Sequence, residues 1–458
     1  MHLEIISDIN SSVIDELRLE TPPINNNQQD KKQLSKVHNR HTQKEISTTM
    51  IKMEPLLMNK KTLLCSSLTL ILQGLFLNTA YASQDKTSLD LLKDSVESQS
   101  QRITELENKL ELTADMLEQN NDSAFSSNNG STTTIGGYGE LHYNSLKNQK
   151  KGGKDKKEID LHRAILFVGH DFNEKIRFWS ELEIEHAQSG DGKSGGEVSM
   201  EQAYVEFDID NRVSIKSGIF LVPAGIINET HEPPTFYGVE RNPVEKNIIP
   251  TTWREGGVSL SARVATAWSF DAAIHSGLST TSDKNYSVRS GRKAVRKAPA
   301  NDLAVTGRVK WTGMPGLELA ATAQYQSDIT QSEDSDAGNA LLTETHAVWS
   351  KGPYALRALY ATWALSGDAP KNIGADKQSG WYVEPSYKIN SQWGVFTRYN
   401  QWDNQAGNSS DSEYTQVDAG VNYWPHPMVS VKVDYQRQST PENKDNYDGF
   451  NLGVGYQF

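Results

Sequence analysis

The last twelve residues, 447–458, constrain the fold more than any other part of the chain. Apolar and polar side chains alternate along them, and the chain ends on an aromatic residue. This period of two predicts a strand with one apolar and one polar face, as required in a wall between lipid and a water-filled lumen. The apolar positions are Phe450, Leu452, Val454, Tyr456 and Phe458, and the polar face carries Asn451, Gly453, Gly455 and Gln457.

The same period recurs in sixteen segments, and the connections between them fall into two classes. Tight turns such as 173–174 and 210–211 follow the even segments, whereas longer polar loops such as 144–157 and 279–301 follow most odd ones. A soluble sandwich or propeller does not predict one-sided loop lengths. We therefore predict an all-β transmembrane barrel of about 16 antiparallel strands over residues 133–458. The segments begin near residues 133, 158, 175, 197, 212, 254, 267, 302, 317, 341, 354, 379, 392, 413, 428 and 448.

The composition agrees with a barrel. Only 36% of the residues are hydrophobic and the mean hydropathy is −0.61, which suits a wall in which alternate residues face lipid. One residue conflicts with the pattern, because Arg163 shares its phase with Ile159, Leu161, Ile165 and Phe167, which the alternation assigns to lipid. This conflict predicts a β-bulge or a misplaced strand boundary near Arg163.

Residues 58–82 have the three parts of a secretory signal peptide: Lys60 and Lys61, an apolar stretch over 62–77, and Ala80-Tyr81-Ala82 as cleavage site. Residues 1–57 are polar, lack a pattern and precede a complete signal, so we interpret them as an upstream extension from a start codon assigned too early. The single cysteine, Cys65, lies within the signal, which excludes a disulfide framework after cleavage. We expect no cofactor and no metal site, and the net charge of −12 argues against nucleic-acid binding.

Residues 83–119 carry a heptad pattern that predicts a coiled coil, which we place in the periplasm. Leucine and isoleucine at both seam positions favour more than two strands, so we expect a homotrimer; the alternative is a lone amphipathic helix lying on the barrel. Residues 120–132 are predicted to be a flexible linker. The seam positions are Leu89, Leu92, Val96, Gln99, Ile103, Leu106, Leu110, Thr113 and Leu117.

The longest loop covers residues 223–253 and is the third long connection. Backbone at membrane depth is tolerated when it lines a water-filled cavity, and this loop is rich in apolar residues that need a surface. We expect it to fold inward and narrow the channel, although an ordinary solvated loop is the alternative. The candidate constriction residues are Glu229, His231, Glu232, Arg241, Glu245, Lys246 and Arg254.

Cationic residues recur on the polar phase of the other strands. Placed opposite the carboxylates of the loop, they would create a transverse field of the kind by which charged rings select ions. This predicted basic wall of the lumen consists of Arg177, Arg308, Lys310, Arg357, Arg398 and Lys432.

Two stretches, residues 221–241 (LVPAGIINETHEPPTFYGVER) and 249–257 (IPTTWREGG), resemble bacterial porins related to the phosphate-selective porins. Residues 136–143 (GGYGELHY) resemble the first strand of that family, and the likeness extends over about residues 133–458. The resemblance implies a sixteen-stranded trimeric porin with its third loop inside the barrel. Residues 223–257 hold five Glu against three Arg or Lys, so this segment leaves the solute open.

We therefore predict a passive diffusion channel for small hydrophilic or charged solutes in the bacterial outer membrane. Its expected partners are membrane lipid, the solutes, and the barrel-insertion machinery, which would read Phe458. One alternative is a structural or adhesive barrel tethered through its coiled coil. An outer-membrane enzyme is another, but Pro233 and Pro234 follow His231-Glu232 and no second histidine completes a zinc-protease motif.

Overall fold

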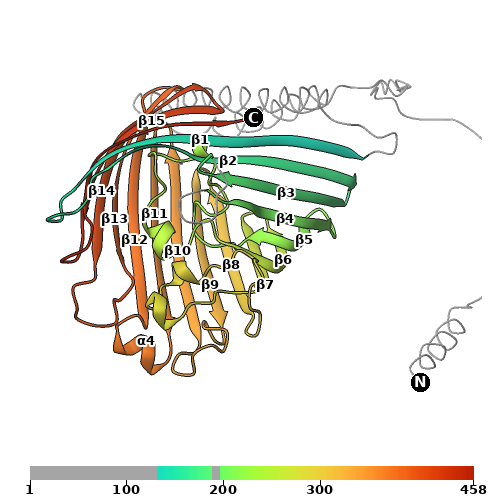
Figure 1. Ribbon diagram of the computed structural model, residues 1–458. Helices are drawn as coiled ribbons and strands as arrows, with labels where there is room; N and C mark the ends of the chain where they lie inside the picture. The colour runs from blue at the N-terminus through green and yellow to red at the C-terminus, as the bar shows by residue number, and fades with distance from the viewer. Residues whose placement is uncertain (1–130, 188–195) are drawn as a thin grey trace, which may run out of the picture. The chain divides into compact units, whose positions relative to one another are not determined.

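The computed structural model describes residues 131–187 and 196–458, which form one closed barrel of sixteen antiparallel strands (Figure 1). Each strand pairs with its neighbours in sequence, and β1 pairs with β16, so the predicted barrel is confirmed. The strands are β1 Thr132–Asn148, β2 Lys156–Asn173, β3 Ile176–Glu185, β4 Val198–Asp208, β5 Val213–Leu221, β6 Arg254–Ala265, β7 Trp268–His275, β8 Ala304–Met314, β9 Leu317–Gln326, β10 Ala340–Lys351, β11 Tyr354–Leu365, β12 Lys377–Lys388, β13 Trp393–Asp403, β14 Tyr414–His426, β15 Val429–Ser439 and β16 Tyr447–Gln457.

The helices of the described chain are short, and none is long and apolar enough to cross a membrane. They are η1 Pro233–Thr235, α3 Val244–Asn247, η2 Ser282–Lys284, η3 Val288–Gly291 and α4 Asp368–Asn372. The predicted upstream extension, signal peptide and coiled coil lie outside the described residues, as does most of the predicted linker.

Every strand begins within two residues of its predicted start, because the period of two is interrupted by turn residues at each end. The largest differences are at β2, β8 and β12. Strand β1 begins at Thr132, one residue inside the predicted linker. The turns after even-numbered strands contain at most four residues, whereas the other end of the barrel carries the long loops, including loop 3 (residues 222–253) and loop 4 (residues 276–303). The predicted alternation is confirmed.

The closing strand pairs with β1 from Tyr138 opposite Gln457 to Asn148 opposite Tyr447. Beyond this ladder, Gly137 and Phe458 exchange two backbone hydrogen bonds of 2.9 Å each. Closure leaves neither strand with an unpaired edge.

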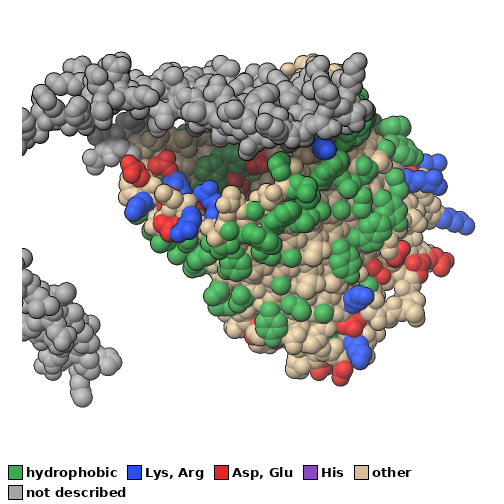
Figure 2. Space-filling view, turned by 180° about the vertical axis from the view of Figure 1, so that it is seen from behind, with side chains coloured by type: hydrophobic (Ala, Val, Ile, Leu, Met, Phe, Trp, Pro, Cys, Tyr) green, Lys and Arg blue, Asp and Glu red, His purple; other side chains and the backbone are tan. Residues whose placement is uncertain are grey.

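The outer wall is apolar. Hydrophobic side chains gather over the face of the barrel shown in Figure 2, and Lys, Arg, Asp and Glu gather at its margins. Aromatic pairs mark the end with the short turns, as aromatic girdles do at a membrane interface. These pairs are Trp268–Trp311, Tyr354–Tyr387 and Trp393–Tyr423.

A β-bulge explains the conflict at Arg163. The register between β1 and β2 shifts after Glu140 pairs with Arg163, since Leu141 then pairs with Leu161 and His162 is left over. The extra residue changes the phase of the strand, so Arg163 points inward and is buried. The predicted bulge is therefore present, but the assignment of Ile165 and Phe167 to lipid was wrong: both are buried, and they pack with Tyr138.

Candidate functional site

Loop 3 is closed at its neck by hydrogen bonds. The backbone N–H of Val222 donates to the carbonyl of Trp253 (2.9 Å), and the side-chain amide of Asn228 donates to the carbonyls of Val222 (2.8 Å) and Trp253 (3.0 Å). The backbone N–H of Trp253 in turn donates to Asn228 Oδ1 (2.7 Å). Between these residues the loop crosses the space enclosed by the strands (Figure 1) and contacts β15, β16 and β1 through η1.

Side chains of β13 and β15 hold the backbone of loop 3. Lys432 Nζ donates to the carbonyl of Gly238 (2.8 Å), and the N–H of Val239 donates to Asp434 (2.6 Å). Arg398 donates to the carbonyl of Tyr237 (3.4 Å) while its guanidinium is paired with Glu384 and Asp418, each 3.0 Å away. These contacts fix the loop against β12–β15.

Two glycines of the closing strand make room for the loop. A Cβ added to Gly455 would lie 2.2 Å from Pro233 Cβ, and one added to Gly453 would lie 2.9 Å from Val239 Cγ1. The polar phase of β16 is thus packed against loop 3, which explains why two of its inward positions carry no side chain.

Glu245 is a buried anchor within loop 3. Its Oε2 accepts the backbone N–H groups of Ile226 (2.9 Å) and Ile227 (2.7 Å), and Oε1 accepts the hydroxyl of Tyr382 (2.7 Å). Asn242 donates a longer fourth hydrogen bond of 3.3 Å. Burial raises the pKa of Glu245, although the hydrogen bonds from Ile227 and Tyr382 act in the opposite direction. This carboxyl group organises the loop rather than lining an opening.

An apolar cluster fills the lumen beside β10–β13. Ile248, Ile249 and Trp253 of loop 3 are fully buried there with Leu278 and Val288 of loop 4. The wall contributes Leu342, Leu359, Trp363 and Tyr382. The cluster therefore occupies the part of the lumen beside β10–β13.

A cavity of about 470 Å³ lies between loops 3 and 4 and strands β2–β4. Three carboxylates line it: Glu183, Glu185 and Glu197. Arg163 lines it as well and pairs with Glu140 (2.8 Å) and Glu183 (3.3 Å). The remaining cations, which we call the basic cluster, are Arg241, Arg254, Arg289, Arg292, Lys293 and Arg296.

Loop 4 supplies most of the basic cluster and is tied to loop 3 by it. Arg289 donates to the carbonyl of Lys246 (2.7 Å), and Arg292 donates to that of Thr252 (2.8 Å). Burial, followed by the charges of neighbouring arginines, lowers the pKa of both guanidinium groups. Within the described residues, Arg254 is the one member of the cluster that pairs with a carboxylate, Glu183, at 3.6 Å.

The predicted constriction residues separate into different environments. Arg241 and Arg254 join the basic cluster, Glu245 is the anchor described above, and Lys246 is exposed. Glu229 pairs with Arg308 of β8, which also binds Asp271 at 2.8 Å. His231 is buried 3.3 Å from Glu201, and Glu232 is half-buried.

The predicted basic wall does not face loop 3 across an open gap. Arg308, Arg398 and Lys432 contact the loop directly, and Arg357 donates to its Thr235 carbonyl (3.0 Å). Lys310 is half-buried on the inward phase of β8. The expectation of charges set apart across the lumen therefore needs correction, because Arg308, Arg357, Arg398 and Lys432 hold the loop in place.

Sequence reasoning missed the basic residues of loop 4. A signal for them was present: residues 279–301 contain six Lys or Arg and one Asp. Their position beside loop 3 depends on how the two loops fold together, which strand periodicity does not specify.

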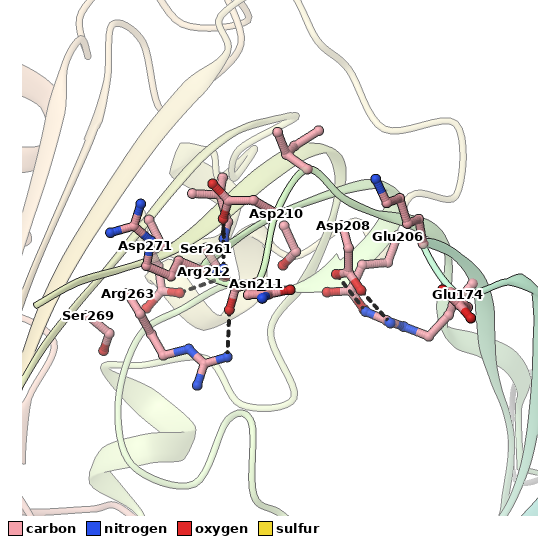
Figure 3. A pocket seen from close by; sticks show the side chains of 16 residues that line it. Glu174, Glu206, Asp208, Asp210, Asn211, Arg212, Ser261, Arg263, Ser269 and Asp271 are labelled. Atoms are coloured by element: carbon pink, nitrogen blue, oxygen red, sulfur yellow. Dashed lines mark hydrogen bonds and ion pairs between the residues drawn. The ribbon is translucent and has the colours of Figure 1, made fainter. Parts of the chain in front are cut away.

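Arg177 lies at the short-turn end of the barrel, where a second cavity of about 1020 Å³ opens (Figure 3). Its guanidinium donates to both carboxylate oxygens of Asp208 (2.6 and 2.9 Å) and also pairs with Glu206 (3.3 Å). Arg263 donates to the carbonyl of Asn211 (3.1 Å), and Ser261 donates to Asp271 (2.8 Å). This mouth is polar and carries both signs of charge.

Comparison with solved structures finds the same fold in three outer-membrane proteins of low identity. The channel DcaP of Acinetobacter baumannii is 14% identical with a TM-score of 0.50, covering 73% of this chain and 99% of its own. OmpF of Salmonella typhi, in complex with daunomycin, is 15% identical with a TM-score of 0.53 and the same coverage. An anion-selective porin of Comamonas acidovorans is 14% identical with a TM-score of 0.50, over 72% of this chain and all of its own.

Sequence comparison gives the closer relationship. An uncharacterized protein of Aquifex aeolicus is 31% identical over 357 residues, which are 71% of this chain and 80% of that protein. The family model described as phosphate-selective porin O and P matches residues 135–458, the whole barrel apart from its first residues. The chain belongs to this family of phosphate-selective porins O and P and is an outer-membrane porin.

Proposed function

We propose that this porin is a passive channel for small anions, and that its narrowest part lies between loops 3 and 4 at the basic cluster. The observation that carries the proposal is the cavity of about 470 Å³, where seven Lys or Arg side chains meet three Glu. Guanidinium groups present several donors in a fixed plane and bind oxyanions through two of them at once.

The charge balance of this cavity favours anions. Glu183 is already engaged by Arg163 and Arg254, whereas Arg289, Arg292, Lys293 and Arg296 have no carboxylate partner among the described residues. Unpaired like charges lining a narrow passage attract counter-ions from solution and repel cations. Because the part of the lumen beside β10–β13 is filled by the apolar cluster, we place the route along β2–β6, from the basic cluster to the mouth near Arg177.

Three further features belong to the same proposal. The long loops would face the cell exterior and the short turns the periplasm, which places residues 83–119 in the periplasm as a coiled coil that assembles a homotrimer. Phe458, 69% exposed on the outer wall, would be read by the insertion machinery. Passage would be driven by the solute gradient alone and would involve no catalytic step.

A matched pair of double variants in loop 4 tests the proposal. Lys293 and Arg296 line the cavity, and their side chains have no hydrogen-bond or ion-pair partner within the described residues, so Lys293→Gln/Arg296→Gln removes charge without releasing the loop. Lys284→Gln/Lys297→Gln removes the same charge from exposed positions of the same loop that do not line the cavity.

In planar bilayers, all three proteins should give stepwise currents. The cavity pair should lower the permeability for chloride and phosphate relative to potassium, and the control pair should match the wild type. Equal ion preference in the wild type and the cavity pair would disprove this location for the constriction. A wild-type protein that conducts no ions would disprove the channel itself.

A further inference from the structure

Three side chains from separate parts of the chain meet in the interior, and none of them lines the cavity of the basic cluster. They are Glu181 of β3, Glu201 of β4 and His231 of loop 3, and at most 5% of each is exposed. One potential ligand atom from each lies within 4.8 Å of the other two, and His231 Nε2 is 3.3 Å from Glu201 Oε1.

A β-bulge directs the second carboxylate into this cluster. The register between β3 and β4 shifts after Glu181 pairs with Gln202, because Leu182 then pairs with Met200. Glu201 is therefore the extra residue and points inward beside Gln202, although neighbouring residues of a regular strand face opposite sides. The strand departs from its pattern at the residue that completes the cluster.

The imidazole of His231 is oriented as a metal ligand. Its Nδ1 lies 3.0 Å from the carbonyl oxygen of Asn228, an acceptor to which this nitrogen must donate. In the neutral ring, Nε2 then carries the lone pair and faces the two carboxylates. A backbone carbonyl that fixes the tautomer of a histidine is a common outer-shell partner in metal sites.

A second cluster in the lumen provides a contrast. Both ring nitrogens of His142 contact carboxylates, Glu140 and Glu240, at 3.2 Å each. That ring has no lone pair left for a metal ion, and its surroundings are those of an imidazolium held by two acids.

The atoms that face one another around His231 lack hydrogen-bond partners. His231 Nε2, both carboxylate oxygens of Glu201 and Oε2 of Glu181 are buried and make no hydrogen bond. Glu181 Oε1 is satisfied by Gln202 (2.6 Å) and Trp179 (3.0 Å). Buried charged groups without partners cost several kcal/mol each, so a compensating cation is expected at this position.

None of the nearby arginines in the described part of the chain forms an ion pair with Glu181 or Glu201. Arg163 pairs with Glu140 and Glu183, and Arg254 also pairs with Glu183. Arg241 donates to the hydroxyl of Thr252 (2.8 Å) and to the backbone carbonyl of His231 (3.4 Å). Glu181, Glu201 and His231 thus present two carboxyl groups and one imidazole nitrogen, a donor set that suits zinc and other divalent transition metals.

We propose that Glu181, Glu201 and His231 bind one divalent transition-metal ion, with zinc as the best match. A tetrahedral zinc ion with ligands at about 2.0–2.1 Å has ligand atoms roughly 3.4 Å apart, close to the 3.3 Å separation of His231 Nε2 and Glu201 Oε1. Water would complete the set of ligands. The ring of Tyr138, whose hydroxyl also lacks a hydrogen-bond partner, lies beside His231 with the ring centroids 5.9 Å apart. The metal joins loop 3 to β3 and β4, and this role does not depend on which solute the channel passes.

Metal content of the full-length porin, purified after expression with added zinc, tests the site. We expect one zinc ion per chain in the wild type and in His142→Gln, a control that changes the other histidine cluster. Glu201→Gln and His231→Gln should lose the metal while retaining the β-sheet circular dichroism of the barrel. Glu181→Gln replaces either variant that fails to insert.

Cobalt gives a second readout, since a tetrahedral Co²⁺ site absorbs visible light. The wild type loaded with cobalt should show this absorption, and the Glu201→Gln protein should not. Equal metal content in the wild type and the ligand variants would overturn the proposal. The proposal would also be overturned if the folded wild type retained no zinc, manganese or iron. That result would identify the cluster as a protonated His231 paired with Glu201.

Discussion

Replacement of Glu245 by alanine tests how much this carboxyl group contributes to holding loop 3 inside the barrel. The substitution removes the acceptor for two backbone N–H groups, those of Ile226 and Ile227, and for the Tyr382 hydroxyl. All of these bonds are in the interior, where Glu245 itself has no exposed surface. Each donor left unsatisfied costs about 1–3 kcal/mol, so the three together destabilise the seated loop by about 3–6 kcal/mol, allowing for entry of water.

A change of this size has a large effect on the position of the loop. Since about 1.4 kcal/mol corresponds to a factor of ten, the ratio of displaced to seated loop should rise by roughly 100-fold to 10,000-fold. Glu245→Gln is the matched control, because its amide oxygen still accepts the two backbone N–H groups. We expect this variant to lose only the stabilisation of the seated loop that the Oε1 hydrogen bond contributes, about 1 kcal/mol.

Single-channel recording and limited proteolysis measure the outcome. The alanine variant should show larger or flickering currents and faster cleavage within residues 222–253, and the glutamine variant should behave like the wild type. The reasoning would be refuted by an alanine variant that folds and gives currents and a cleavage rate indistinguishable from those of the wild type.

Two further predictions concern β16. Gly455→Val places a side chain where Pro233 now packs, and overpacking of about 1–3 kcal/mol should displace loop 3 and increase the noise of the single-channel current. Gly307→Ala has open space around its Cβ and should leave the current noise unchanged. Equal noise in the two variants would contradict the packing of Pro233 against Gly455. Phe458→Ala should lower the fraction of the protein that reaches the folded, heat-modifiable form in cells, which is measured by gel mobility without boiling. The molecules that do fold should form a normal pore. An unchanged yield of folded protein would exclude Phe458 as a recognition element.

The wall of the barrel could be predicted from the sequence because each strand carries its own signal. Alternation of side chains and turn residues are local, and they located β1 and β16 to within one residue. The bulge near Arg163 was also visible, since a charge on the apolar phase is costly. The burial of Ile165 and Phe167 could not be predicted in the same way. After a bulge the strand changes phase, so apolar residues turn inward although the alternation of apolar and polar residues in the sequence is unchanged.

The candidate site was predicted less well because it depends on contacts between distant segments. The sequence of loop 3 marked Arg241 and Arg254, yet it gave no sign that Arg289 and Arg292 of loop 4 would bind loop 3 carbonyls beside them. In the same way, Glu201 reads as one more polar residue of β4 until the bulge places it opposite His231. Pairing of loops and shifts of register are tertiary properties.

The sign of the zero-current potential across a bilayer with a salt gradient tests the central claim most directly. With purified wild-type protein and potassium chloride more concentrated on one side, an anion-preferring basic cluster predicts a potential of the sign set by chloride. A potential of the sign set by potassium would contradict the assignment of the basic cluster as the narrowest part of the channel.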